Sequence, residues 1–132
     1  MPRRKLTRGM LLTEGNEKTL EEVMKMPRDE KFVCTLLYNR LTYNMYVEAY
    51  KYRHSIRNDE DLPEYLRELI KIYELFDICT DHLPEDIQKV YHKLFERYDS
   101  LQYISYGMSY SKTSIHRFKK MIIKSLVNCL NI

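Results

Sequence analysis

Basic and hydrogen-bonding side chains gather near the C-terminus, at spacings that place most of them on the outer face of one helix. Cationic side chains bind phosphate oxygens, and hydrogen-bond donors can identify base edges in the major groove of DNA. From residue 100 to residue 132 the sequence contains five cations and no acidic residue. The pattern therefore predicts a helix that contacts double-stranded DNA. The candidate DNA-binding residues are Lys112, Thr113, His116, Arg117, Lys119, Lys120 and Lys124.

The residues before and among these side chains have the apolar spacing of a helix-turn-helix. This motif joins two short helices through a tight turn and a small shared core, so apolar residues recur at fixed offsets. Ser105 supplies the small residue where the helices would touch, Ser109 the turn, and Ser111 the N-cap of the second helix. The expected core positions are Ile104, Met108, Tyr110, Ile115, Phe118 and Ile122.

The segment from residue 83 to residue 130 resembles region 4 of bacterial sigma factors. It resembles more closely the C-terminal module of phage late-transcription regulators of the RinA and ArpU type. The likeness lies in residues 111–123, SKTSIHRFKKMII, with a capping serine, a threonine two residues later, a His-Arg pair and two adjacent isoleucines. Two positions depart from the family pattern, since Ser109 stands where glycine is usual and Ser105 stands where alanine is usual.

The resemblance implies a sequence-specific regulator of a phage or mobile element that acts at late promoters. Its partners would be promoter DNA and RNA polymerase or another transcription factor. The N-terminal residues of a recognition helix reach the base edges. We therefore expect base contacts from Lys112, Thr113, His116 and Arg117, and phosphate contacts from Lys119, Lys120 and Lys124.

The charge of the remaining chain supports an alternative from another functional class. The first eight residues hold four cations, so residues 9–99 carry 22 − 5 − 4 = 13 cations against 19 acids, a balance of −6. An acidic body is compatible with a protein-interaction module that imitates a sigma factor and inhibits a transcription factor. Steep salt dependence of DNA binding would separate the two functions, because phosphate contacts release counterions.

Helical periodicity and few turn residues predict an all-α protein. Three glycines and four prolines leave little material for the turns of a sheet. Residues 1–15 are expected to form a basic flexible arm, residues 16–80 a helical body, and residues 81–132 the helix-turn-helix module. Within the body, Pro27 would end a short helix, Asp29 would cap a helix reaching about residue 57, and Pro63 and Pro84 would begin two further helices.

The helix expected over residues 29–57 is rich in tyrosine. Its predicted buried stripe is Cys34, Tyr38, Leu41, Met45, Ala49, Tyr52 and Ile56, at spacings of three and four. Tyr43, Tyr46 and Tyr50 fall outside this stripe. Because tyrosine is enriched at interfaces, these three residues are a candidate homodimer or partner surface. An ordinary core with a few exposed rings is the equal alternative.

The sequence contains no motif that indicates catalysis or the binding of a metal or cofactor. The sequence has no glycine-rich phosphate loop, no metal-ligand pair at helical spacing and no nucleophile motif, so we expect no enzyme activity, no metal and no cofactor. No apolar run reaches the roughly 20 residues that a membrane-spanning helix needs. The three cysteines, Cys34, Cys79 and Cys129, are expected to be buried free thiols of a cytoplasmic protein.

Overall fold

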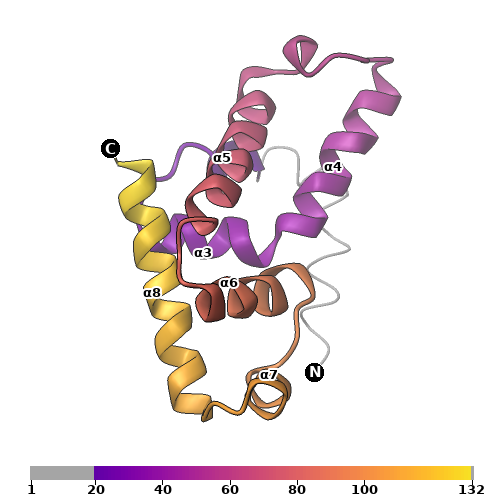
Figure 1. The fold of residues 1–132 in the computed structure, drawn as a ribbon. Coiled ribbons are helices and arrows are strands. Elements are labelled where there is room, and N and C mark those ends of the chain that lie inside the picture. The colour runs from indigo at the N-terminus through magenta and orange to yellow at the C-terminus, as the bar shows by residue number, and fades with distance from the viewer. Residues whose placement is uncertain (1–19, 132) are drawn as a thin grey trace.

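The computed structural model describes residues 20–131, and every regular element in that part of the chain is a helix. This confirms the all-α class. The arm predicted for residues 1–15 lies outside the described residues. After a helical turn at residues 20–23, the elements are α3 (Glu30–Tyr38), α4 (Arg40–Arg53), the 3-10 turn η1 (Asp59–Asp61), α5 (Glu64–Thr80), α6 (Glu85–Tyr91), the π-helical η2 (His92–Glu96), α7 (Leu101–Met108) and α8 (Lys112–Leu130) (Figure 1).

The predicted single helix over residues 29–57 is wrong, because Asn39 divides it into α3 and α4. Asp29 caps α3 as expected, and its side chain accepts a hydrogen bond from the Phe32 N–H. At the other end, the backbone N–H and the side-chain amide of Asn39 both donate to the Thr35 carbonyl. The N–H of Leu41 then donates to the Tyr98 hydroxyl at 3.3 Å. A residue 57 positions away thus satisfies a donor that the first turn of α4 leaves unpaired.

The break changes which face of α4 is buried. Tyr43 and Tyr46 are only 3% and 4% exposed, and Tyr50 is half-buried. Met45 and Tyr52, which the predicted stripe placed inside, are 49% and 87% exposed. The candidate interface at Tyr43, Tyr46 and Tyr50 is therefore wrong for its first two members. These two rings belong to the core because the break turns their face of α4 inward, where the Tyr46 hydroxyl is hydrogen-bonded to the Tyr65 hydroxyl of α5.

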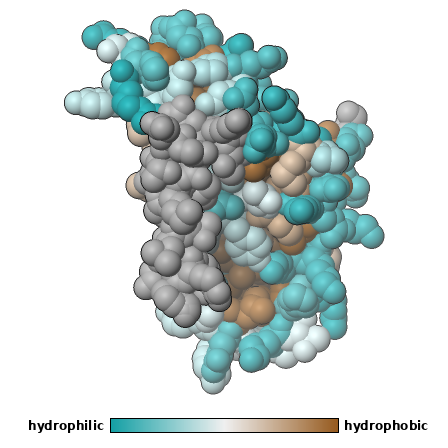
Figure 2. Space-filling model, turned by 180° about the vertical axis from the view of Figure 1, so that it is seen from behind, coloured by the Kyte–Doolittle hydropathy of each residue, from teal (hydrophilic) through white to brown (hydrophobic). Residues whose placement is uncertain are grey.

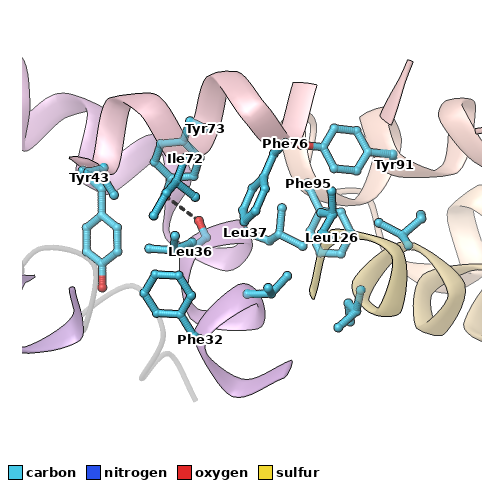
Figure 3. Close-up of a cluster of buried hydrophobic side chains, with 14 of the residues drawn as sticks. Phe32, Leu36, Leu37, Tyr43, Ile72, Tyr73, Phe76, Tyr91, Phe95 and Leu126 are labelled. Atoms are coloured by element: carbon cyan, nitrogen blue, oxygen red, sulfur yellow. Dashed lines mark hydrogen bonds between the residues drawn. The ribbon is translucent and has the colours of Figure 1, made fainter. Parts of the chain in front are cut away.

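Aromatic side chains from several helices form the centre of the core (Figure 3). Phe32 of α3, Phe76 of α5 and Phe95 of η2 are at most 1% exposed. The hydroxyl of Tyr73, a ring that is 4% exposed, donates to the Leu36 carbonyl at 2.6 Å. This bond matters because a buried hydroxyl without a partner costs free energy. It also fixes α5 against α3.

Arg40 joins the start of α4 to α5 at the edge of this core. Its guanidinium donates to both carboxylate oxygens of Asp77 at 2.8 Å and to the Tyr91 hydroxyl at 3.3 Å. The same guanidinium lies 4.8 Å from the centroid of the Tyr73 ring. The hydrogen bond to Asp77 raises the pKa of Arg40 above its usual value. Arg40 thus brings three elements together through one charged group.

α8 lies along one side of the molecule and packs against α3, α5, α6 and α7 (Figure 1). Ile115, Ile122 and Leu126 are completely buried in this contact, and they belong to the same apolar cluster as the aromatic core. Helices on both sides of residue 80 therefore share one core. None of the helices in residues 20–131 combines the length and apolar character needed to cross a lipid bilayer.

Two of the three cysteines are joined, which contradicts the prediction that all are free thiols. Cys79 near the end of α5 and Cys129 near the end of α8 form a disulfide, with Cα atoms 6.8 Å apart. The two cysteines are 50 residues apart in the sequence, and that spacing does not predict a disulfide. The pairing arises because α8 packs on α5. Cys34 on α3 is free.

Candidate nucleic-acid interface

α7 and the turn after it prepare the start of α8. The side chain of Ser100 accepts a hydrogen bond from the Tyr103 N–H and so caps α7. Ile104 is 1% exposed and anchors α7 in the core. The helix ends at Ser109, whose φ of 60° and ψ of 30° lie in the left-handed region. The turn thus falls at the residue that the sequence pattern predicts, and a left-handed residue directly after a helix is a common way to end it.

Three contacts of Tyr110 and Ser105 hold the turn in place. The Ser105 hydroxyl donates to the carbonyl of Tyr110, which joins the turn back to α7. The Tyr110 ring packs edge-on against Phe118 of α8, with centroids 5.1 Å apart. Its hydroxyl donates to the Asp86 carboxylate of α6, and this hydrogen bond raises the pKa of Tyr110. The turn is therefore hydrogen-bonded to α6 and α7 and packed against α8.

α8 begins as the sequence predicted, with its apolar residues facing inward. The Ser111 side chain accepts a hydrogen bond from the Ser114 N–H at 3.1 Å and caps the helix. Ile115 and Ile122 are fully buried, and Phe118 between them is half-buried against the core. The opposite face of the helix is therefore directed away from the core.

Six of the seven predicted DNA-contacting residues lie on that outer face and are exposed. No hydrogen bond or ion pair joins any of them to a carboxylate within residues 20–131. Cations that no carboxylate in the described residues neutralises keep their charge available for an anionic partner. The six are Lys112, Thr113, His116, Arg117, Lys120 and Lys124.

The seventh, Lys119, has a different environment. Its side chain is half-buried, and its ammonium lies 5.0 Å from the centroid of the Tyr38 ring on α3. Cys34, one turn earlier on α3, lies within range of an electrostatic interaction with the Lys119 ammonium. Burial raises the pKa of the Cys34 thiol, and Lys119 partly opposes that shift. Lys119 therefore belongs to the contact between α3 and α8 rather than to the outer face.

Two exposed aromatic residues of α7 were not among the predicted site residues. Tyr103 and Tyr106 of α7 are 60% and 76% exposed, and α7 carries no charged side chain. Gln102, also exposed, donates to the Tyr106 hydroxyl at 3.4 Å. Tyr103 and Tyr106 are three residues apart and so share one face of α7, which is not the face of the predicted core residue Ile104. This spacing is the signal that could have identified them. Figure 2 shows that hydrophobic residues also reach the surface in the lower half of the face viewed there.

The described residues offer no arrangement suited to a metal ion. Among residues 20–131, no group of three or more His, Cys, Asp or Glu side chains is close enough to share one ion. One surface hollow of about 550 Å³ lies at the C-terminal end of α4 and is lined by Glu48, Lys51, Tyr52, Ser55, Ile56 and Arg57. It contains none of the predicted DNA-contacting residues.

α7 and α8 thus pack together across the turn, and α8 exposes a cationic, hydrogen-bonding face while α7 exposes two aromatic side chains. Comparison with known proteins adds no assignment to this geometry. No protein-family model matches the sequence, and no curated protein or solved structure matches it significantly.

Proposed function

We propose that the chain binds double-stranded DNA through α7, the turn at Ser109 and α8, which act as a helix-turn-helix. The observation that carries this proposal is the row of exposed side chains on α8 that have no carboxylate partner among the described residues. A firmly held helix that presents cations and hydrogen-bond donors on one face suits the major groove. The contacts of Tyr110 support the proposal because they fix the start of α8, where base contacts would be made.

The position of each side chain along α8 suggests its role. Lys112, Thr113, His116 and Arg117 occupy the first two turns, from which a recognition helix reaches base edges. Lys120 and Lys124 follow on the same exposed side and would bind phosphates. Lys119 was expected to bind phosphate as well. Because its ammonium already lies against Tyr38, we assign it a smaller share of the DNA affinity.

We further propose that DNA binding serves the regulation of transcription in a phage or mobile element. This step rests on the resemblance of residues 83–130 to sigma region 4 and to phage late-transcription regulators. It makes promoter DNA the ligand and RNA polymerase the second partner. Dimerisation through Tyr43 and Tyr46 is not part of the proposal, because both rings are buried within the monomer.

Selection of binding sites from a random duplex library tests sequence-specific recognition. The wild-type chain is expected to enrich one short motif, and Thr113→Ala/His116→Ala is expected to relax the preference at one or two positions of that motif. Lys25→Ala/Lys71→Ala, which removes two exposed cations from the body, is the matched control and should leave the motif unchanged. Enrichment of no motif by the wild-type chain would contradict sequence-specific recognition.

One observation favours a second candidate, a module that binds and inhibits a transcription factor. Tyr103 and Tyr106 form an exposed aromatic pair on a helix without charge, and tyrosine is enriched in protein interfaces. This candidate predicts binding to purified RNA polymerase holoenzyme that persists at high salt. Tyr103→Ala/Tyr106→Ala should abolish that binding, and Lys112→Ala/Arg117→Ala should leave it intact. The opposite pattern would exclude this candidate.

A further inference from the structure

The disulfide joins the C-terminal ends of α5 and α8, two helices that pack against each other. Cys79 is the penultimate residue of α5 (Glu64–Thr80), and Cys129 is the penultimate residue of α8 (Lys112–Leu130). The DNA-contacting residues proposed above begin at the other end of α8, at Lys112. The disulfide therefore holds the part of α8 that is farthest from its proposed working end.

The two cysteines of the disulfide, Cys79 and Cys129, are half-buried rather than fully buried. A small thiol in solution can reach a disulfide in such a position, and exchange requires that access. Cys34, the third cysteine, is not part of the bond and is also half-buried. We propose that the Cys79–Cys129 disulfide is a redox-sensitive clasp, which fixes the last two turns of α8 (residues 124–130) to α5 when oxidised and releases them when reduced.

The chemistry of the clasp is ordinary thiol–disulfide exchange with a dithiol as the reductant. A thiolate of the dithiol attacks one sulfur, forms a mixed disulfide and releases the other cysteine as a thiolate. The second thiol of the reductant then closes its own disulfide and frees the remaining cysteine. Two electrons and two protons pass to Cys79 and Cys129, and the dithiol leaves as a cyclic disulfide.

Other contacts decide how much of α8 the clasp controls. Ile115 and Ile122 are fully buried and Ile123 is buried as well, so residues 112–123 of α8 remain docked whether or not the disulfide is present. At the far end, Leu126 is buried and the Asn131 amide donates to the Arg28 carbonyl at 3.1 Å. Val127 and Leu130 also pack against the core but are only partly buried, so this end of α8 is held less completely than its first turns. Reduction should therefore loosen residues 124–131 without unfolding the whole chain. This inference does not depend on DNA binding.

The test compares the full-length chain after equilibration with oxidised glutathione and after treatment with dithiothreitol. Alkylation and intact-mass measurement should find one reactive thiol in the oxidised protein and three in the reduced protein. The melting temperature should fall on reduction by on the order of 10 °C, because the bond closes a loop of 50 residues in the unfolded chain. Amide hydrogen exchange should accelerate in residues 124–130 and remain unchanged in residues 113–119.

Two variants separate the clasp from general effects of the reductant. Cys34→Ser removes only the free thiol and should keep the full shift in melting temperature. Cys79→Ser/Cys129→Ser should melt like the reduced wild type and should not respond to dithiothreitol. The proposal would be overturned by three reactive thiols after oxidation or by equal melting of oxidised and reduced wild type. Uniform acceleration of exchange along α8 would overturn it as well.

Discussion

The ammonium of Lys119 lies 5.0 Å from the centroid of the Tyr38 ring, and this contact separates Lys119 from the other cations of α8. The neighbouring Lys120 points to solvent, although the two residues are adjacent in the sequence. α8 therefore has one basic residue that holds the helix to α3 and several that face outward. The distinction gives the two lysines different expected roles in stability and in DNA binding.

Lys119→Ala is expected to lower the free energy of unfolding by about 0.5–1 kcal/mol, the usual contribution of a partly exposed cation–π contact. Lys120→Ala should change it by less than about 0.5 kcal/mol, because an exposed residue without such a contact is nearly neutral. Urea unfolding followed by circular dichroism measures both. Equal effects of the two substitutions would show that the Tyr38 contact does not stabilise the fold.

Arg40 and Asp77 should be energetically coupled. Their paired hydrogen bonds at 2.8 Å bridge α4 and α5, and a double-mutant cycle with Arg40→Ala and Asp77→Ala is expected to give a coupling of about 1–3 kcal/mol. Arg40→Ala should cost more than Asp77→Ala, since it also removes contacts with Tyr91 and Tyr73. Urea unfolding of the three variants gives the coupling, and additive single effects would contradict it.

Two residues at the end of α7 do not suit their backbone positions. Serine occupies a left-handed position that favours glycine, and glycine occupies a helical position that favours alanine. Ser109 adopts a left-handed conformation, which costs a non-glycine residue roughly 1–2 kcal/mol. Gly107 lies inside the helix, and a Cβ there would meet no atom within 4 Å. Ser109→Gly and Gly107→Ala are each expected to raise the free energy of unfolding by about 0.5–1 kcal/mol. Thermal melting tests this, and destabilisation by Ser109→Gly would refute the assigned turn.

Buried tyrosines should make the fold sensitive to alkali. Burial raises the pKa of Tyr43 to about 12, and burial also raises the pKa of Tyr91 to about 12. An unfolded tyrosine loses its proton near pH 10. The unfolded state thus binds fewer protons between about pH 10 and pH 12, so the free energy of unfolding falls over that window and is unaffected below it. Urea unfolding at a series of pH values should show this fall.

Tyr43→Phe is the variant that tests the cause. It removes one buried ionisable group, and the free energy of unfolding should then fall less steeply with pH than in the wild type, with little difference between the two at neutral pH. The comparison cancels the titration of lysines, which both proteins share. Parallel curves for the two proteins would mean that Tyr43 takes no part in alkaline unfolding.

Local signals in the sequence predicted much of the fold. Asp29 and Ser111 cap α3 and α8 as expected, because each cap requires only a side-chain oxygen beside the first turn of its own helix. Pro63 and Pro84 directly precede the first residues of α5 and α6, as expected. The turn at Ser109 was also expected. In each case the controlling interactions lie within a few residues.

The errors come from interactions between distant segments. The break at Asn39 is supported by Tyr98, and it turned α4 so that Met45 faces solvent and Tyr46 faces the core. Both faces of α4 carry apolar or aromatic residues, so periodicity alone could not choose between them. The pairing of Cys79 with Cys129 and the docking of Lys119 on Tyr38 likewise require the positions of α5 and α3 against α8.

DNA binding through α8 is the central claim, and a salt series tests it most directly. Fluorescence anisotropy with a labelled duplex would compare the wild type, Lys120→Ala/Lys124→Ala, and the control Lys25→Ala/Lys71→Ala. We predict that affinity falls steeply with salt, and that the α8 variant both weakens binding and reduces the slope of log K against log salt by roughly 2, one for each lost phosphate-neutralising cation. The control should match the wild type. No binding at low salt, or equal slopes for all three proteins, would contradict the claim that α8 binds DNA.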